Sequence, residues 1–487
     1  MAPKRTVTLR STDPEAGDVV AAAGLTERFD AIRAELEVPG EFPADVIAEA
    51  ERVAASPLSR PEQDLSDLPF LTIDPPGSMD LDQAMLLERD GDGYRVRYAI
   101  AHLESFVEPG GAIDAEARRR GQTIYAPDER TPLHPPVLSE GAASLLPDET
   151  RPAYVWDIRL DARGAHTSAE VHPALVRSVD RLEYTAVQAD IDAGTDDERL
   201  VLLKEIGELR IALEQERGGA SLPMPDQQVE EVEGGFRLHL RPLVPAEDWN
   251  AQISLLTGMV AAEIMLEAGV GILRTMPDPE EQSITQLRRV ATALGVEWAE
   301  RTDHGTFLRS LDGTDPKHLA LIHESTILFR GAGYTAFDGQ PPEVVEQAAI
   351  AAPYAHVTAP LRRLVDRFGL ALCAAVSAGG EVPAWVREAL PQLPELMETS
   401  DRRAGGVERA TTDAVEAATL ADRVGQEFAA VVIDVPEGGD DRGGLEVHLL
   451  DPPVLARAKG EAQLGAEVTV RLTGVDPAEG RVDFEIV

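Results

Sequence analysis

The order of strand-like and helix-like patterns along the chain constrains its fold most strongly. From Leu68, short apolar stretches typical of strands follow one another: FLTID, GYRVRYAIAHLESFV and AYVWDIRLDARGAHTSAEVHPALV, the last with a turn at residues 163–164. Beyond Ser178, apolar residues recur at helical spacing over residues 250–273, 318–329, 361–376 and 407–427. Strands followed by helices predict an α+β domain, in which helices surround the strands.

The two ends of the chain differ from this middle part. Residues 1–66 alternate short helix-like stretches with proline and glycine, which predicts a small helical module, favoured as a packing cap over a separate binding unit. Residues 426–487 contain about five short strands separated by Gly, Pro and Asp, which predicts a small all-β barrel of the OB type. Only Phe428 and Phe484 are aromatic there, so a structural barrel and a nucleic-acid-binding barrel both stay open. The expected domains are residues 1–66, 67–425 and 426–487.

Charge and cysteine content restrict the kind of protein this can be. The 86 acidic residues outnumber the 45 basic ones and give a net charge of −41, which repels polyanions over most of the surface. A site for a phosphate backbone must then be local and rely on arginines or divalent cations. The single cysteine, Cys373, excludes an internal disulfide, and no stretch reaches the ~18 apolar residues of a membrane span. We therefore expect a soluble, cytoplasmic protein without a cleaved leader.

An acidic loop follows the first strand and suggests metal chemistry. Its sequence is TIDPPGSMDLDQA, in which the Pro-Pro-Gly turn can fold Asp74 back towards Asp80 and Asp82. Carboxylate oxygens are the ligands that Mg²⁺ prefers, and bound Mg²⁺ can position water for phosphodiester hydrolysis. The spacing does not match a calcium loop of the EF-hand type. The alternative is an ordinary turn in which the Asp side chains cap the backbone.

A second segment, YAHVTAPLRRLVDR, places two arginines at the expected start of a helix. Pro360 suits the first turn and Thr358 can cap it, so Arg362 would lie near the positive end of the helix, where anions bind. A guanidinium there could clamp a phosphate and offset the charge that develops in the transition state. The alternative is that Arg362 and Arg363 pair with nearby aspartates on the surface.

Together, and in this order, the two segments resemble the catalytic RNB domain of the ribonuclease II / ribonuclease R family, in a short bacterial form. That family's pattern begins with T-I-D, five residues and D-x-D-D, and it ends with T-S-P-I-R-R-Y-x-D. This chain has TID at residues 72–74, then Asp80 and Asp82, and TAPLRRLVD at residues 358–366. Between them, residues 114–125 resemble the family's D-x-E-A-x-x-R-G-T-x-Y. The resemblance extends from about residue 66 to residue 487.

The resemblance implies an activity and a set of site residues. The activity is 3′-to-5′ hydrolysis of single-stranded RNA to nucleoside 5′-monophosphates with Mg²⁺, for which Mn²⁺ could substitute. The implied catalytic residues are Asp80, Asp82 and Arg362, and the implied metal-holding residues are Asp74, Asp80, Asp82 and Gln83. The implied RNA-binding residues are Tyr125, Arg120, Thr358 and Arg363. Tyr125 would stack on a base near the 3′ end, with a buried core tyrosine as its alternative.

Several positions depart from the family pattern. Gln83 stands where the family has its fourth acid, and its amide oxygen can ligate or orient water but carries no charge. Ala359, Leu361 and Leu364 replace a serine, an isoleucine and an aromatic residue of compatible size. These departures keep a second hypothesis open, a catalytically impaired RNA-binding or regulatory pseudoenzyme of the same fold. A third hypothesis, an acidic scaffold with incidental motif similarity, predicts no affinity for RNA.

Overall fold

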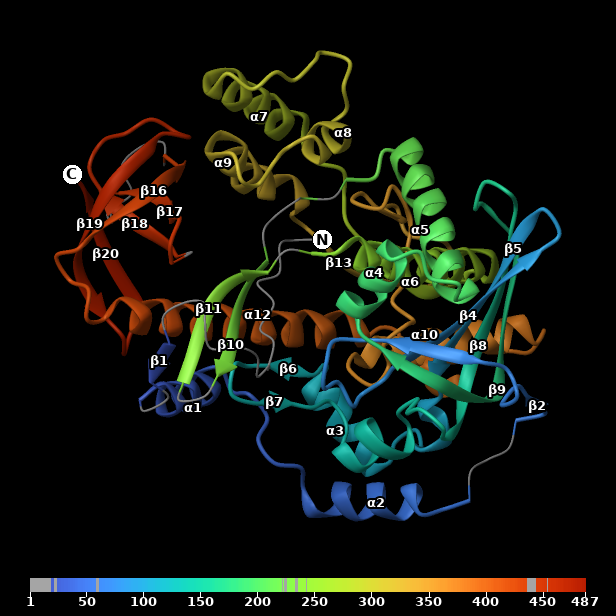
Figure 1. The fold of residues 1–487 in the computed structure, drawn as a ribbon. Helices are drawn as coiled ribbons and strands as arrows, with labels where there is room; N and C mark the ends of the chain where they lie inside the picture. Colours follow the sequence, from blue (N-terminus) through green and yellow to red (C-terminus); the bar gives the residue numbers. More distant parts are fainter. Residues whose placement is uncertain are drawn as a thin grey trace.

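The computed structural model describes residues 19–21, 24–57, 61–220, 222, 226–232, 235–241, 243–435, 444–452 and 454–487. Figure 1 shows a mixed domain of strands and helices on one side and a small barrel on the other, with the long helix α12 (Leu393–Leu420) running between them. The α+β prediction is confirmed, because one sheet gathers six of the nine strands described before residue 183, and most helices come after it.

The central sheet is built largely from the predicted strands. Its members are β2 (Gln63–Asp64), β3 (Phe70–Ile73), β4 (Gln83–Asp90), β5 (Gly93–Ala101), β8 (Thr150–Leu160) and β9 (His166–Leu182), in the order β2-β9-β3-β4-β5-β8. The long β9 pairs antiparallel with β8 and then, beyond residue 177, parallel with β3, which closes the sheet on itself. The ends of β3 and β9 therefore lie side by side.

Helices pack against this sheet on both faces. They include α2 (Ala44–Ala54), α3 (Ala112–Arg120), α4 (Tyr184–Asp192), α5 (Glu198–Arg217), α6 (Pro245–Ala268), α10 (Leu364–Ser377) and α11 (Ala384–Ala389). Leu71 of β3 belongs to a buried cluster with α5, α6 and α10, whereas its neighbour Phe70 belongs to one with α2. Successive residues of the strand thus face opposite layers, as expected for a strand buried on both faces.

Helix α6 runs through the middle of this core. A Cβ atom at its Gly258 would lie 2.1 Å from the ring of Tyr354, so only glycine fits at that contact. By length and composition alone, α6 is also the one helix of the described residues that could cross a membrane. However, 56% of its most apolar stretch is buried inside the protein, as in a core helix of a folded domain.

Two predicted helices have different boundaries in the structure. The helix predicted over residues 250–273 ends at Ala268, because Gly269 turns the chain with φ 69°. The residues that follow form β12 (Val270–Thr275), which pairs with β13 (Gly333–Asp338). The helix predicted over residues 407–427 is α12, which begins at Leu393. Its two adjacent glycines, residues 405 and 406, interrupt the apolar pattern, so its first half was not predicted.

The N-terminal residues form the two predicted helices and also a short strand. Helix α1 (Leu25–Glu35) packs against α12, and α2 packs against α3. Strand β1 (Val19–Ala21) pairs with β11 (Gly235–Arg241), which forms a hairpin with β10 (Asp226–Val232). Residues before Val19 lie outside the described residues, so the module predicted over residues 1–66 is described only in part. Because β2 belongs to the central sheet, the domain boundary at residue 66 stays a prediction.

The predicted C-terminal barrel is confirmed. Strands β16 (Glu427–Asp434), β17 (Leu445–Leu449), β18 (Leu455–Lys459), β19 (Glu467–Asp476) and β20 (Arg481–Ile486) close in the order β16-β17-β18-β20-β19. Phe428 and Phe484 are both buried and meet edge to face, with ring centroids 6.0 Å apart. Both rings stabilise the core of the barrel, and neither presents a stacking surface to solvent.

The remaining elements are a helical lobe beside the barrel and two short strand pairs. Helices α7 (Glu281–Leu294), α8 (His304–Arg309) and α9 (Pro316–Glu324) form a lobe at the top of Figure 1, and α9 contacts β16. Two short strand pairs are β6 (Ile124–Tyr125) with β7 (Arg130–Thr131) and β14 (Glu346–Gln347) with β15 (Ala352–Pro353).

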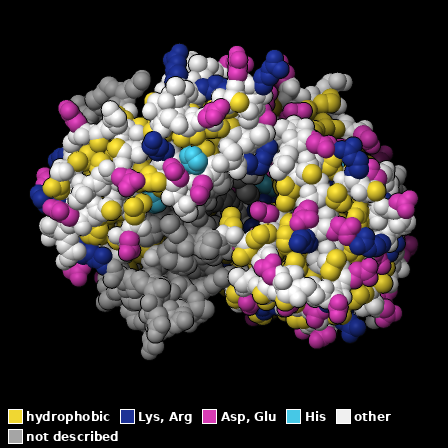
Figure 2. All heavy atoms as spheres, turned by 45° about the horizontal axis from the view of Figure 1, so that its top comes forward, with side chains coloured by type: hydrophobic (Ala, Val, Ile, Leu, Met, Phe, Trp, Pro, Cys, Tyr) yellow, Lys and Arg dark blue, Asp and Glu magenta, His cyan; other side chains and the backbone are white. Residues whose placement is uncertain are grey.

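Figure 2 shows acidic and basic side chains mixed over one face of the molecule, which is hollowed near its middle.

Candidate active site

The acidic loop joins β3 to β4, and a buried serine fixes its path. Ser144 Oγ donates a hydrogen bond to the Met79 carbonyl at 2.6 Å and accepts one from the Leu81 amide at 2.9 Å. Asp80 and Asp82 flank Leu81, so both are held by this anchor. The predicted loop is therefore a fixed feature of the fold, with its carboxylates at one end of the sheet.

Asp82 connects this loop to the arginine segment, because it bonds Leu361, which lies 279 positions later in the chain. Its side chain is 5% exposed, and its Oδ1 accepts a hydrogen bond from the Leu361 amide at 2.7 Å. Its Oδ2 lies 3.4 Å from Nε of Arg362, whose side chain is 46% exposed. The two motifs thus meet, and a buried carboxylate positions a guanidinium that still faces solvent.

Asp80 is held from another side by Arg130, at 2.8 Å, and Arg130 also pairs with Glu140 at 2.5 Å. Tyr125 lies opposite Arg130 in the pairing of β6 with β7, and its side chain is 38% exposed. Desolvation raises the pKa of Tyr125, and the charge of Asp80 adds to the rise. Tyr125 therefore borders the carboxylates with an accessible ring, and the buried-core alternative does not hold.

Burial opposes the ionisation of two of these carboxylates. Burial raises the pKa of Asp74 to about 6, against the lowering effect of Arg362 and with a further rise from Asp80. Burial likewise raises the pKa of Asp82 well above its usual range, although Arg362 and the Leu361 amide lower it. A cation bound among these groups would favour their ionised forms.

The donor atoms fit a hard divalent cation in their chemistry, but they are not grouped as a ready-made site. Asp74, Asp80 and Asp82 offer carboxylate oxygens, the ligand type that Mg²⁺ prefers. Across the described ranges, no three His, Cys, Asp or Glu side chains form a group that could hold a metal ion. Arg130 and Arg362 neutralise Asp80 and Asp82 instead. Cation binding there requires these two guanidinium groups to move off the carboxylates.

The prediction of a helix start at Pro360 is wrong. Pro360 lies in a turn, and α10 begins at Leu364. Thr358 does not cap the helix, because it is 2% exposed and its hydroxyl bonds that of Ser254 in α6 at 2.9 Å. The backbone stays extended at Arg363, with φ −135° and ψ 127°, where it forms an isolated bridge with the residues after α3. This burial also removes Thr358 as an RNA contact.

Arg363 holds the turn in place and does not face the site. Its guanidinium forms two hydrogen bonds of 2.9 Å with the carboxylate of Asp366, whose side chain is fully buried. The same carboxylate accepts a hydrogen bond from the Ala359 amide at 2.7 Å. The pair ties the start of α10 to the residues before the turn. Arg363 thus has a structural role in place of the RNA contact that the resemblance implied.

Arg120 is also buried, with 1% exposure. It pairs with Glu116 at 2.7 Å, donates hydrogen bonds to the carbonyls of Pro132 at 3.1 Å and Gly40 at 2.5 Å, and stacks on the ring of Phe42 at 3.7 Å. These contacts join α3 to the N-terminal residues. An RNA chain cannot reach so enclosed a side chain, so the expected contact is corrected to a packing role.

Gln83 uses both ends of its side-chain amide. Its Nε2 donates a hydrogen bond to the Thr358 carbonyl at 2.6 Å, and its Oε1 accepts one from the hydroxyl of Tyr98. Because a carbonyl can only accept, the orientation of the amide is determined. A carboxylate at this position could not make the first bond. Gln83 therefore connects β4 to the segment that carries Arg362, a role that was not predicted.

Arg181 borders the carboxylates and was not predicted from the sequence. It lies at the end of β9, where it pairs with Thr72 of β3, and its charge lowers the pKa of Asp74. The one hydrogen bond of its side chain among the described residues is to the sulfur of Met79, at 3.7 Å. The signal that could have found it is a basic residue at the end of a strand, but the pairing of β9 with β3 has no local sequence mark.

Tyr184 and Arg130 were missed as well. Tyr184 is the first residue of α4, and its hydroxyl accepts a hydrogen bond from Asn250 of α6 at 3.0 Å. Burial raises the pKa of Tyr184, and the charge of Asp74 adds to the rise. Tyr125 thus borders the site on the side of Asp80, and Tyr184 borders it on the side of Asp74.

Two family models match the chain. They are the RNB domain, over residues 62–372, and the RNase II-type exonuclease C-terminal S1 domain, over residues 426–487. Ribonuclease R of Escherichia coli (strain K12) is 29% identical over 483 residues, which cover 87% of this chain and 57% of that relative. The chain therefore spans little more than half the length of this curated relative.

Solved structures share the fold. The apo form of Mycoplasma genitalium RNase R has a TM-score of 0.83 at 18% identity, over 95% of this chain and 78% of that one. Its complex with ribose methylated single-stranded RNA gives the same values. Yeast Ssd1, described as a pseudonuclease, has a TM-score of 0.67 at 16% identity, over 93% of this chain and 59% of that one.

Proposed function

The chain belongs to the RNB domain family, and we propose that it is a 3′-to-5′ exoribonuclease that hydrolyses single-stranded RNA to nucleoside 5′-monophosphates. The observation that carries this proposal is the contact between Asp82 and Arg362, which unites the acidic loop and the arginine turn in one site. Phosphodiester hydrolysis uses both kinds of group, because carboxylates hold a cation that activates water and a guanidinium stabilises charge on the phosphate.

Arg362 is suited to bind the scissile phosphate. Its Nε faces Asp82, and no partner of its two terminal nitrogens is found within the described part of the chain. Two adjacent N–H groups match two oxygens of a phosphate. A phosphate that replaces Asp82 as the partner of this guanidinium would have the charge of its pentavalent transition state offset by Arg362.

The residues that would hold a divalent cation, Mg²⁺ or its substitute Mn²⁺, are Asp74, Asp80, Asp82 and the amide oxygen of Gln83. When bound, the cation supplies a Lewis acid and lowers the pKa of water, which makes hydroxide available for attack on phosphorus. An RNA phosphate competes with Asp82 for Arg362, and this competition frees the carboxylate for the cation. We therefore expect RNA and the cation to bind cooperatively.

Tyr125 and Arg181 are the groups that we assign to RNA. The exposed ring of Tyr125 borders the carboxylates and can stack on a base near the 3′ end. Arg181 has no carboxylate partner in the described ranges and lies close enough to Asp74 to lower its pKa, so it can bind a phosphate next to the scissile one. The solved complex of the Mycoplasma relative with single-stranded RNA supports RNA as the substrate class.

We propose a cytoplasmic location for this activity. The one cysteine, Cys373, is buried and unpaired, which agrees with a reducing compartment. Soluble RNA is present in that compartment, and the proposed activity needs no membrane.

A second candidate function is RNA binding without turnover. Gln83 favours it, because its amide is engaged by Tyr98 and Thr358 and brings no negative charge to the acidic loop. The likeness to yeast Ssd1 supports it at the level of fold alone. We place it second because Asp82 and Arg362 are both present and in contact.

The proposal is tested with single-stranded RNA labelled at its 5′ end, incubated with the purified chain and either Mg²⁺ or a chelator. We expect progressively shorter labelled products and released nucleoside 5′-monophosphates with Mg²⁺ alone. A circular RNA of the same sequence has no 3′ end and should survive. Intact linear RNA at high protein concentration contradicts the proposal, and RNA that is bound but not shortened favours the second candidate.

A further inference from the structure

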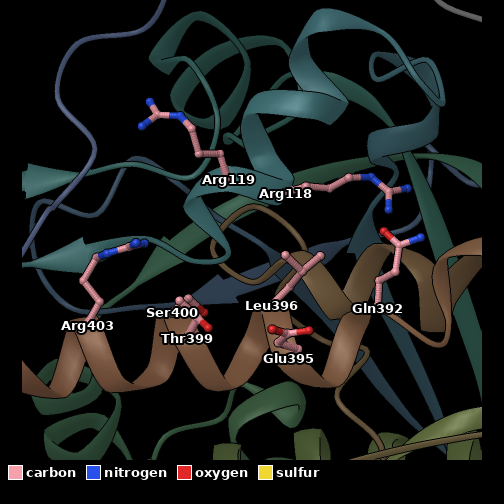
Figure 3. Close-up of a pocket in the computed structure, with 8 residues that line it drawn as sticks. All are labelled: Arg118, Arg119, Gln392, Glu395, Leu396, Thr399, Ser400 and Arg403. Atoms are coloured by element: carbon pink, nitrogen blue, oxygen red, sulfur yellow. The ribbon is translucent and has the colours of Figure 1, made fainter.

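A cavity of about 300 Å³ lies between α3 and α12 (Figure 3). Arg118 and Arg119 line it from the last turn of α3, and Arg403 lines it from α12. Thr399 and Ser400 of α12, and Gln392 just before this helix, add polar side chains. No residue that we assigned to the active site lines this cavity, so it is a separate feature of the molecule.

Each carboxylate that pairs with a cavity arginine of α3 is shared with a second arginine. Asp114 is shared by two arginines, Arg118 at 3.2 Å and Arg367 at 2.6 Å. Glu116 is shared in the same way by the two other arginines of α3, at 2.6 Å and 2.7 Å. Two carboxylates thus serve four guanidinium groups, of which Arg118 and Arg119 line the cavity and the other two are buried outside it.

Arg403 also lines the cavity, and its guanidinium has no carboxylate partner in the described part of the chain. The helix dipole favours arginines in the last turn of α3, but Arg403 lies in the interior of α12, where no helix end attracts it. The other two arginines of the lining, Arg118 and Arg119, already have carboxylate partners, so Arg403 is the one left for a ligand. The chain has a net charge of −41, so the three arginines of the cavity are opposite in sign to its overall charge.

We propose that this cavity binds a small phosphate-bearing ligand of the nucleotide class. Guanidinium groups bind phosphate oxygens in pairs, and Arg403 is available for such a bond. The amide of Gln392 and the hydroxyl of Thr399 can bond the rest of the ligand, and Leu396 gives an apolar contact. The volume lies at the lower end of the range for small-molecule sites, roughly 300–1,000 Å³, which suits a mononucleotide.

The cavity shares a wall with the residues that support the active site. A Cβ atom at Gly121, just after α3, would lie 2.4 Å from Cβ of Ser400, so the two segments are in direct contact. The Gly121 carbonyl accepts a hydrogen bond from the Leu364 amide at 2.9 Å, and the Thr123 amide donates one to the Arg362 carbonyl at 2.9 Å. A ligand in the cavity would therefore contact Ser400, which packs against the segment that supports Arg362.

Titration calorimetry of the whole chain with AMP, inorganic phosphate and adenosine tests the proposal without RNA or metal. We expect AMP to bind, inorganic phosphate to bind more weakly, and adenosine not to bind. Arg403→Gln should weaken AMP binding by at least about tenfold, because it removes a charge-assisted bond. Arg402→Gln is the matched control, because Arg402 is 68% exposed, lies outside the lining and faces Glu398.

Thermal melts establish that each variant is folded, and Arg119→Gln is a second variant that should also weaken AMP binding. The proposal is overturned if AMP does not bind, if adenosine binds as tightly as AMP, or if Arg402→Gln and Arg403→Gln have equal effects. It is also overturned if only Arg362→Ala removes binding, since AMP would then occupy the active site. The readout needs no turnover, so its outcome is independent of the proposed function.

Discussion

The side-chain Nε2 of Gln83 lies 2.6 Å from the carbonyl oxygen of Thr358 and joins two segments that are 275 positions apart. The position at which the chain lacks the family's fourth acid is therefore a structural link. Because the other end of the amide accepts a hydrogen bond from Tyr98, the glutamine fits both neighbours. Gln83 is therefore compatible with an active site, because its amide fixes the segment that carries Arg362.

Gln83→Glu tests this link, since it keeps the shape but removes the donor and adds a charge against a carbonyl. We expect the free energy of unfolding to fall by about 1–3 kcal/mol, because the buried Thr358 carbonyl loses its partner. Denaturant melts measure this change, and RNA turnover should fall with it. Gln83→Asp restores the family's acid, and an inactive wild type with an active Gln83→Asp variant would establish the pseudoenzyme.

Arg181→Ala tests the assignment of an RNA phosphate to this side chain. Loss of one phosphate contact should weaken binding of single-stranded RNA and reduce the slope of log affinity against log salt by roughly 0.7. Fluorescence anisotropy in the presence of a chelator measures both without cleavage. Arg163→Ala is the control, because Arg163 is 70% exposed on the turn between β8 and β9. Equal salt slopes in wild type and Arg181→Ala would remove Arg181 from the site.

Tyr125→Ala tests the stacking of an RNA base. Removal of an exposed ring that stacks on one base should weaken RNA binding by about 1–3 kcal/mol. Tyr125→Phe keeps the ring and should bind like the wild type, because no hydrogen bond of the hydroxyl enters the stack. The same anisotropy titrations give both values. A phenylalanine variant as weak as the alanine variant would show that the hydroxyl, and not the ring, makes the contact.

Glu324 should make stability depend on pH where α9 meets the barrel. Burial raises its pKa from 4.5 to about 7, and Asp434 and Glu446 add to the rise. The folded chain therefore holds an extra proton between these two values, so this group's contribution to the free energy of unfolding falls as pH rises through that window. Thermal melts from pH 5 to pH 8 should show a smaller loss for Glu324→Gln than for wild type. Identical pH profiles would contradict the assignment.

Much of the fold could be predicted because its elements have local signals. Strands β3, β5, β8 and β9 and the five barrel strands are apolar runs bounded by Gly, Pro and Asp. Helix boundaries were less predictable. Gly269 ends α6 before a stretch that still looks apolar, and the start of α10 depends on a backbone bridge between Arg363 and Gln122. Such tertiary contacts have no mark in the adjacent sequence.

The residues of the candidate site were also only partly predictable from the sequence. The acidic loop and Arg362 could be predicted, because their residue types and order resemble a known motif. The roles of Arg120 and Arg363 could not, because an arginine's role depends on which carboxylate packs against it, here Glu116 and Asp366. Arg181 escaped prediction because it reaches the site only through the pairing of two strands.

The account rests on Asp82 and Arg362 acting together, so the most direct test is the rate of 3′ nucleotide release by Asp82→Asn, Arg362→Ala and the double variant. Each single change should lower the rate at least about a hundredfold, because each removes a group that stabilises the transition state. The double variant should be no slower than the slower single variant, as is found for residues that act as a unit. Single variants that retain most of the wild-type rate, or losses that multiply in the double variant, would contradict a shared site.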